Sequence, residues 1–217
     1  MKVAKFGGTS LASAEQIKKI CKIIESDQDR RIIVVSAPGK RHPHDMKVTD
    51  LLIKIARNSL DGQNCGPAIT KVIDRYTDIA KDLGIDGAFI KCMENDIKDL
   101  INTDVDDENA FMDTMKAAGE DNCAKLVAEY LRNSGVEANY VNPQVAGMIL
   151  SDEPGNARML EKSYKKLRAL RDMSGVTVFP GFFGYSETGK VVTFPRGGSD
   201  ITGAILAAAI NADIYEN

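Results

Sequence analysis

Hydrophobic residues occur in two contrasting patterns along the chain, as short unbroken runs and as helical stripes. Residues 2–6 and 31–36 are short apolar runs, the second rich in β-branched residues, as is typical of strands covered on both faces. Between them, four hydrophobic residues follow the spacing of one helix face: Ile17, Ile20, Cys21 and Ile24. Ser13 and Gln16 form a capping box where this helix begins. Strand, helix and strand in this order predict a βαβ unit, and hence a parallel sheet with a right-handed crossover.

Residues 49–133 carry helical stripes almost throughout. Thr49 is the predicted N-cap of the first helix in this region. Pro67 opens the next helix and Gly84 ends it. The pair at 119–120 is predicted to interrupt the last helical segment. We therefore predict a helical insertion over 49–133, placed between the early and the late strands.

The last third of the chain returns to strands. Predicted strands lie near residues 138–141, 147–150, 176–181 and 212–215, with helices over about 160–171 and 201–210. The turn at 187–189, followed by an apolar run, predicts a β-hairpin. Together with the βαβ unit, this order predicts an α/β fold with a mainly parallel sheet.

Composition narrows the class of protein. The 217 residues are 43% hydrophobic and 27% charged, which fits one globular domain with a sizeable core. The formal net charge of -3 argues against a general nucleic-acid or anionic-membrane binder. No basic and apolar leader precedes the first strand and no apolar run approaches membrane-spanning length, so a cytoplasmic location is expected.

The four cysteines lie far apart and form no C-x-x-C pair: Cys21, Cys65, Cys92 and Cys123. Cys21, Cys92 and Cys123 fall in helical patterns, which favours buried, reduced thiols.

His42 and His44 flank a proline in a polar loop without an accompanying acidic or cysteine cluster. A solvated loop is favoured over a metal site there, and no protein metal ligand is predicted.

Two familiar phosphate motifs are absent. Residues 184–190 fit most of a Walker A loop, but Val191 replaces the Ser or Thr that would bind the metal, and a strand pattern follows instead of a helix. Residues 38–40 also fail, because Val34 stands where the first glycine is needed. No G-x-G-x-x-G occurs, so a Rossmann dinucleotide site is unsupported.

Two glycine-rich loops remain as candidate anion sites. The first glycine loop follows the first strand and is Lys5-Phe6-Gly7-Gly8-Thr9-Ser10; the second precedes a helix and is Arg196-Gly197-Gly198-Ser199-Asp200. Either loop alone is more simply explained as a turn. Loops at the carboxyl ends of parallel strands meet at one edge of a sheet, where ligands bind. The two loops together therefore predict one pocket with a lysine, an arginine, glycine amides, hydroxyls and an aspartate.

These motifs resemble the amino-acid kinase family, specifically the N-terminal kinase region of the aspartate kinases. The matching blocks are Lys5 to Ser10, Val34-Val35-Ser36-Ala37, Val48-Thr49-Asp50-Leu51-Leu52, Gly119-Glu120, and Arg196 to Thr202, in the order of the family. The resemblance implies an αβα three-layer sandwich around a mainly parallel sheet. It also implies ATP-dependent phosphorylation of the side-chain carboxylate of L-aspartate to 4-phospho-L-aspartate, the first step towards lysine, threonine and methionine. Mg2+ would be held mostly by ATP phosphates and water.

The resemblance also implies roles for individual residues. Lys5 would contact the transferring phosphate and Asp200 would hold Lys5, with the nucleotide phosphates near Gly7, Gly8, Thr9 and Ser10. Residues implied in aspartate binding are Thr49, Glu120, Arg196, Gly198 and Ser199. Glu120 would pair with the ammonium group, while Arg196 would bind a carboxylate through two hydrogen bonds. Simpler alternatives are an N-cap for Thr49, a solvated charge for Glu120, and a first-turn acid for Asp200.

The chain departs from the family pattern at its carboxyl end. Aspartate kinases continue with loops that hold the adenine, the ribose and the outer phosphates, and then with regulatory domains. We therefore expect residues 1–217 to be one kinase domain, incomplete at the carboxyl end, with little or no ATP turnover by itself. Either it belongs to a longer polypeptide or another chain completes it. The expected partners are further copies of the chain in a homo-oligomer, or the rest of a longer polypeptide. Alternatives are a non-catalytic amino-acid-binding or regulatory chain, and a related kinase with another acidic substrate such as glutamate.

Overall fold

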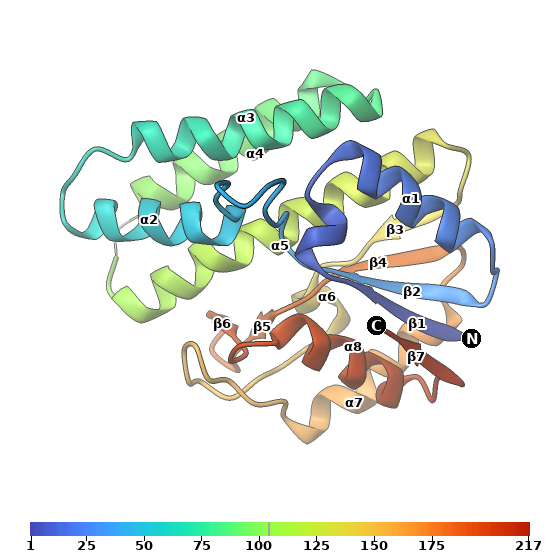
Figure 1. The fold of residues 1–217 in the computed structure, drawn as a ribbon. Helices are drawn as coiled ribbons and strands as arrows, with labels where there is room; N and C mark the ends of the chain where they lie inside the picture. The colour runs from blue at the N-terminus through green and yellow to red at the C-terminus, as the bar shows by residue number, and fades with distance from the viewer. Residues whose placement is uncertain (104) are drawn as a thin grey trace.

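The computed structural model describes residues 1–103 and 105–217 and contains a parallel sheet of five strands. The strands are β1 (Lys2–Phe6), β2 (Arg30–Val35), β3 (Ala138–Tyr140), β4 (Val176–Pro180) and β7 (Ile214–Glu216), in the order β3-β4-β2-β1-β7 (Figure 1). Phe6 pairs with Val35, and Val35 with Pro180, so the carboxyl ends of the three central strands lie side by side. The predicted α/β fold with a parallel sheet is confirmed.

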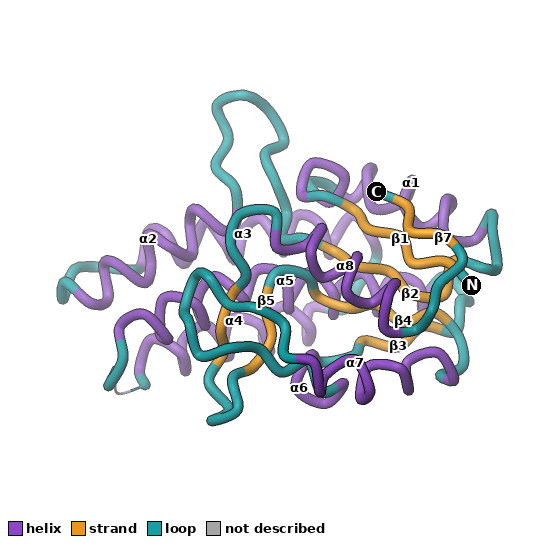
Figure 2. The backbone as a smooth tube through the Cα atoms, turned by 90° about the horizontal axis from the view of Figure 1, so that it is seen from below, coloured by secondary structure: helices purple, strands orange, loops and turns teal. Residues whose placement is uncertain are grey.

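Helices cover both faces of this sheet (Figures 1 and 2). One face carries α1 (Ala14–Glu25) and α5 (Glu108–Asn133), with α3 (Gly66–Leu83) packed against α1 away from the strands, and the other carries α7 (Glu161–Leu167), the 3-10 helix η2 (Arg168–Asp172) and α8 (Gly198–Ala209). Successive residues of β2 point to opposite layers: Ile33 and Val35 pack on the α1 side, whereas Ile32 and Val34 pack on the α8 side. This double coverage explains why β2 is an unbroken apolar run, and it gives the three-layer sandwich that was expected.

The region predicted as a helical insertion is confirmed, with two local corrections. It consists of α2 (Val48–Leu60), α3, α4 (Gly87–Asn102) and α5. Thr49 is not an N-cap, because α2 begins at Val48 with Lys47 in the capping position. Gly119 and Glu120 do not interrupt a helix, because α5 is continuous through them. A Cβ on Gly119 would lie 2.9 Å from Ala37 Cβ, so this glycine permits close packing rather than a break.

A two-stranded antiparallel hairpin forms a second, smaller sheet. Its strands are β5 (Phe183–Tyr185) and β6 (Val191–Thr193), which confirms the predicted hairpin and assigns the Walker-like segment to its turn. The strand predicted over 147–150 is wrong. Gly147 ends the short helix α6 (Pro143–Ala146) in a left-handed conformation, and only single bridges follow, at Ile149 and Leu150.

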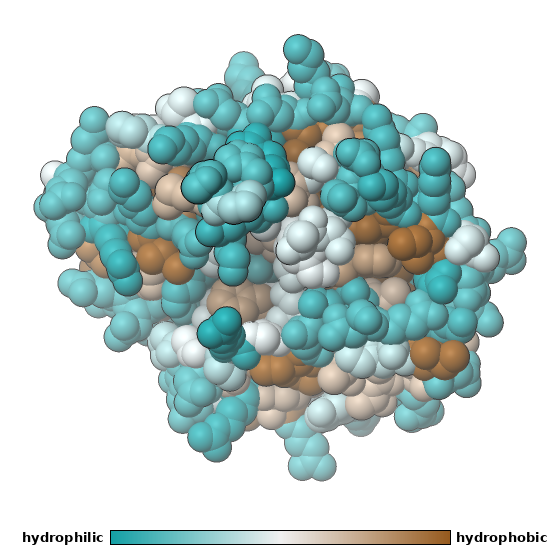
Figure 3. Space-filling model, in the orientation of Figure 1, coloured by the Kyte–Doolittle hydropathy of each residue, from teal (hydrophilic) through white to brown (hydrophobic). Residues whose placement is uncertain are grey.

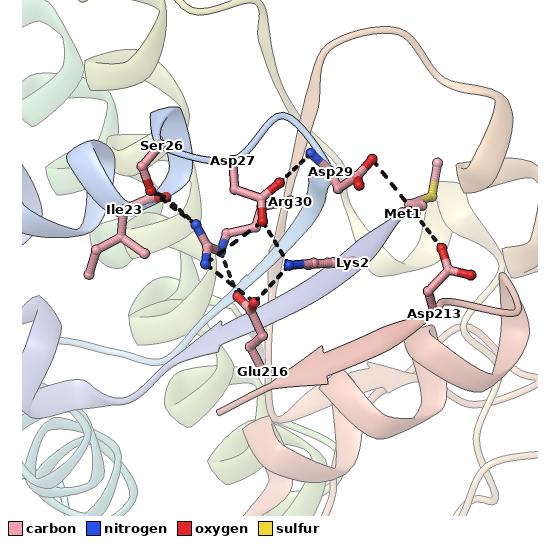
Figure 4. A network of polar contacts seen from close by, with 9 residues as sticks. All are labelled: Met1, Lys2, Ile23, Ser26, Asp27, Asp29, Arg30, Asp213 and Glu216. Carbon is pink, nitrogen blue, oxygen red and sulfur yellow. Dashed lines mark hydrogen bonds and ion pairs between the residues drawn. The ribbon is translucent and has the colours of Figure 1, made fainter.

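Charged side chains fasten the last strand to the first two (Figure 4). Glu216 of β7 accepts hydrogen bonds from both Nε and Nη2 of Arg30, at 2.5 and 3.3 Å, and lies 3.5 Å from Lys2 Nζ. Lys2 also pairs with Asp27 at 2.7 Å. Since β7 contains only three residues, these ion pairs supplement a short ladder of backbone hydrogen bonds.

The cysteines are free thiols with differing exposure. Cys21 and Cys123 are buried, as predicted, and Cys65 is partly buried. Cys92 is exposed, which corrects the expectation that it is buried: α4 buries only Met93 and Ile97 on its inner face.

In the described part of the chain, no helix is both long and apolar enough to cross a membrane.

Candidate active site

An ion pair joins the two glycine loops at the carboxyl edge of the sheet. Lys5, near the end of β1, pairs with Asp200, in the first turn of α8. The Lys5 side chain is only 12% exposed, whereas the Asp200 side chain is about half exposed. Gly197 has a φ of 84° immediately before α8, a conformation that favours glycine. The prediction that the two loops meet at one edge is confirmed for Lys5 and Asp200.

The first glycine loop places backbone amides beside the lysine ammonium group. Gly7 precedes the 3-10 helix η1 (Gly8–Leu11), whose first hydrogen bond runs from Ser10 N–H to Gly7 O at 2.9 Å. A Cβ on Gly7 would lie 3.5 Å from Lys5 Nζ, so the loop backbone and the ammonium face the same space. Thr9 is exposed. A cavity of about 410 Å³ opens here, between Lys5, Gly7 and Ser10 on one side and Glu216 and Asn217, the last two residues of the chain, on the other.

Gly8 is packed directly against the loop that follows β2. Gly39 N–H donates to Gly8 O at 2.8 Å, and a Cβ on Gly39 would lie 2.7 Å from the carbonyl carbon of Gly8. A Cβ on Gly8 would in turn lie 2.8 Å from Ala37 O. Both positions therefore require glycine for close backbone approach. Sequence reasoning did not single out Gly39 as a site residue. The one signal for it in the sequence is that a glycine follows the second buried strand within a few residues, as glycines follow the first strand.

Glu120 is a buried carboxylate on α5 that lacks a full set of partners. It is 5% exposed, and within the described residues its Oε2 has no hydrogen-bond partner. Burial raises the pKa of Glu120 to about 8, although the backbone amide of Ala37 acts in the opposite direction. The alternative of a solvated surface charge is therefore wrong. A cationic group bound beside Glu120 would provide the missing partner and favour the ionised form.

Gly198 and Ser199 of the second glycine loop lie against the end of β4. Both are buried, and a Cβ on Gly181 would lie 2.7 Å from both Cβ and Oγ of Ser199. A Cβ on Gly198 would lie 2.6 Å from the Phe182 ring. The amino end of α8 is thus fixed at the same edge of the sheet as Lys5.

Two of the predicted substrate residues form no hydrogen bond or ion pair with Glu120 among the described residues. Arg196 is exposed, and it forms no hydrogen bond or ion pair with any residue that the structure describes. Thr49 is partly buried in the first turn of α2. The structure therefore brings Lys5, Asp200 and the glycine amides together, while Arg196 and Thr49 form no polar contact with them in the described part of the chain.

Asp113 is a second buried carboxylate of α5 that sequence reasoning missed. It is 1% exposed, and its Oδ2 accepts hydrogen bonds from Gly155 N–H at 2.7 Å and from Thr193 N–H at 2.8 Å. Its Oδ1 accepts from Lys116 Nζ at 3.0 Å. Asp113 precedes Glu120 by two helical turns, so the two carboxylates share a face of α5. It ties α5 to β6, the strand that leads into the second glycine loop.

Comparison with known proteins gives a consistent assignment. The chain matches the model of the amino acid kinase family over residues 1–217. It is 48% identical to Aspartokinase 3 of Bacillus subtilis over 217 residues, which are 100% of this chain and 48% of that protein. The crystal structure of Clostridium acetobutylicum aspartate kinase has a TM-score of 0.81 at 34% identity, covering 100% of this chain and 47% of that one.

A second solved structure, E. coli aspartokinase III in complex with aspartate and ADP, has a TM-score of 0.83 at 25% identity. The match covers 99% of this chain and 48% of the E. coli chain. The chain thus spans about half the length of the curated relative and of the two solved structures. The match of the family model over all 217 residues fits the fold and the meeting of the two glycine loops, and the chain belongs to the amino acid kinase family.

Proposed function

We propose that this chain carries the catalytic residues of an ATP-dependent aspartate kinase, which forms 4-phospho-L-aspartate in the first step towards lysine, threonine and methionine. The observation that carries the proposal is the Lys5–Asp200 ion pair, because it joins the two glycine loops around a cation at one edge of the sheet, beside a cavity that the first glycine loop lines. The names of the relatives, and the aspartate and ADP bound to the E. coli protein, support the choice of substrates.

The reaction explains why the site contains positive charge but needs no general base. The side-chain carboxylate of aspartate is ionised at neutral pH and is already a nucleophile. One of its oxygens attacks the γ-phosphorus, and the bond from that phosphorus to the bridging oxygen breaks, leaving its electrons on ADP. No proton is transferred. Catalysis therefore requires in-line positioning and compensation of the negative charge on two approaching anions.

The first glycine loop and Asp200 would form the phosphate side of the site. The Lys5 ammonium would contact the transferring phosphate, with the amides of Gly7 and Gly8 and the hydroxyls of Thr9 and Ser10 nearby. Asp200 pairs with Lys5 and so fixes the position of the ammonium. Mg2+ would arrive with the ATP phosphates and neutralise part of their charge.

Glu120 would form the amino-acid side together with α8 and its preceding loop. The ammonium of aspartate would supply the cation that the buried Glu120 lacks. Arg196 would bind the α-carboxylate as a planar fork, with Thr49 and Ser199 donating hydroxyl hydrogen bonds and Gly198 adding its amide. The exposed guanidinium of Arg196 has freedom to move towards such a ligand.

The test is aspartate-dependent ADP formation by the full-length polypeptide that contains this chain. Lys5→Ala is expected to lower kcat by about 10²–10³-fold, as loss of a charge-stabilising donor does in other enzymes. Lys22→Ala, which removes an exposed lysine of α1, serves as the matched control and is expected to retain activity. A normal rate in Lys5→Ala would contradict the role of Lys5. ADP formation with glutamate but not aspartate would contradict the choice of substrate.

A further inference from the structure

The loop between β2 and α2 is held by one buried arginine of α3. Arg75 is 2% exposed, and its Nη1 donates to Gly39 O at 2.7 Å. Its Nη2 donates to Asp45 Oδ2 at 2.5 Å and to Met46 O at 3.2 Å. A single guanidinium group therefore forms hydrogen bonds to the loop both near its start and near its end.

Gly39, one of the residues that accept a hydrogen bond from Arg75, also contacts the first glycine loop. Gly39 uses its carbonyl to accept from Arg75 and its N–H to donate to Gly8 O, at 2.7 and 2.8 Å respectively. The backbones of Gly39 and Gly8 are also in direct contact, since neither position has room for a Cβ. Any shift of Gly39 is therefore transmitted to Gly8, and through it to the amides beside Lys5.

Near α2, the loop is held by the ion pairs of Asp45 with two arginines. Asp45 accepts from Arg41 Nε and from Arg41 N–H, both at 2.9 Å, in addition to Arg75. Burial acts to raise the pKa of Asp45, but hydrogen bonds from Arg41 and the charge of Arg75 hold it well below its usual range. Asp45 is therefore held in its ionised form opposite Arg75. Hydrophilic side chains project where this loop lies in front of α2 (Figures 1 and 3).

Stability alone does not explain an arginine at this position. Burying a guanidinium carries a large desolvation cost, and well-packed apolar residues often serve stability equally well. Arg75 Nε is moreover buried without a partner in the described part of the chain. What the guanidinium provides is a rigid fork that reaches two separate points of one loop.

We propose that Arg75 is a positioning residue for the phosphate side of the site. It fixes Gly39, Gly39 fixes Gly8, and the position of Gly8 determines where the amides of the first glycine loop lie relative to Lys5. The proposal rests on the proposed function insofar as this loop binds ATP phosphates. Arg75 itself is buried and would not touch the substrates.

The experiment compares ATP and aspartate affinities of the full-length polypeptide by calorimetry, with hydrogen exchange of the Gly39 amide as a separate readout. Arg75→Met is expected to raise the Kd for ATP at least tenfold, leave the Kd for aspartate within about threefold, and speed exchange at Gly39 at least tenfold. Arg75→Lys, which keeps the charge but loses the fork, is expected to recover part of the ATP affinity.

Arg31→Met is the matched control. Arg31, at the start of β2, also donates to two backbone carbonyls, those of Gly175 and Met173, but at the opposite edge of the sheet. It is expected to leave both affinities and Gly39 exchange unchanged. If Arg75→Met does not fold, Gly39→Ala disturbs the same contact while Arg75 stays intact, and the same selective loss of ATP affinity is expected.

The outcomes separate this proposal from the proposed function. Failure of the wild type to bind ATP or to form ADP from aspartate would overturn the function, and this role of Arg75 with it. A wild type that works normally, together with an Arg75→Met variant that binds ATP equally well, would overturn only the role of Arg75. Equal weakening for ATP and aspartate would also overturn it, because general loosening of the fold would then suffice.

Discussion

The proposed phosphate side and the proposed amino-acid side of the site differ in whether their charged groups are paired within the protein. On the phosphate side, Lys5 is paired with Asp200 and Gly8 O accepts from Gly39. On the amino-acid side, the buried Glu120 Oε2 lacks a partner among the described residues, and Arg196 is exposed without one. A fixed set of charges suits stabilisation of a transition state. An unpaired buried carboxylate suits discrimination, because only a ligand with a matching cation satisfies it.

The largest effect on aspartate affinity is expected from Glu120→Gln, which removes the charge but keeps the shape. Loss of the pair with the substrate ammonium should cost about 3 kcal/mol, or roughly a hundredfold rise in the Kd for aspartate. The ligand-free protein should become more stable, since a desolvated carboxyl group is replaced by a neutral amide. Calorimetric titration and thermal unfolding without ligand measure the two effects.

Asp121→Asn is the control for this prediction. Asp121 is the next residue of α5, but its carboxylate accepts from Tyr140 and pairs with Lys125 at 2.8 Å. This variant should bind aspartate as the wild type does. Unchanged aspartate affinity in Glu120→Gln would remove the contrast between the two sides, because the unpaired carboxylate would then have no role in binding.

Asp113 allows the amino-acid side to be disturbed without touching a proposed substrate contact. Asp113→Ala leaves the N–H groups of Gly155 and Thr193 without their acceptor, which should cost about 3 kcal/mol of unfolding free energy. In Asp113→Asn, one amide oxygen can take the place of Oδ2 and accept both bonds, so most of that stability should remain. Urea unfolding measures both variants. Equal destabilisation by the two would show that the charge, and not the backbone bonds, is what matters.

Sequence reasoning succeeded where one rule of local structure determines the outcome. The parallel strands follow from unbroken β-branched runs, and the meeting of Lys5 with Asp200 follows from the rule that the carboxyl ends of parallel strands share an edge. The cap of α1 was also readable, because Ser13 Oγ accepts from Gln16 N–H as its spacing predicts.

The failures concern contacts between elements distant in the sequence. Helix α5 is buried around most of its surface, so it shows no single apolar stripe, and Gly119 was taken for an interruption. The burial of Glu120 follows from that packing and could not be read from neighbouring residues. Arg75 and Gly39 carry no sequence signal of their shared role, since their link arises only when α3 and the loop after β2 pack together.

The titration of Glu120 gives a pH test of the same contrast. Its pKa is about 8 in the folded protein, raised from 4.5, so between those values the folded state holds a proton that the unfolded state releases. The ligand-free protein should therefore lose stability as pH rises from 5 to 8, by up to about 1.4 kcal/mol per pH unit from this group. The difference between wild type and Glu120→Gln, from chemical unfolding at each pH, isolates the contribution. A difference that is flat with pH would contradict the burial argument.

The smallest effects are expected from Gly7 and Gly8 of the first glycine loop, whose surroundings differ. A Cβ on Gly8 would lie 2.8 Å from Ala37 O, whereas a Cβ on Gly7 would first meet Lys5 Nζ at 3.5 Å. Gly8→Ala must displace backbone and should cost about 1–2 kcal/mol of stability, together with ATP affinity. Gly7→Ala should fold almost as stably as the wild type, and its effect should appear mainly in ATP binding, since the methyl group would occupy space beside the ammonium. Thermal unfolding and ATP titration of the two variants, with aspartate affinity as the reference, measure this difference. Equal stability of the two would mean that Gly8 can move away from the loop after β2, and that the phosphate side is less rigid than its hydrogen bonds indicate.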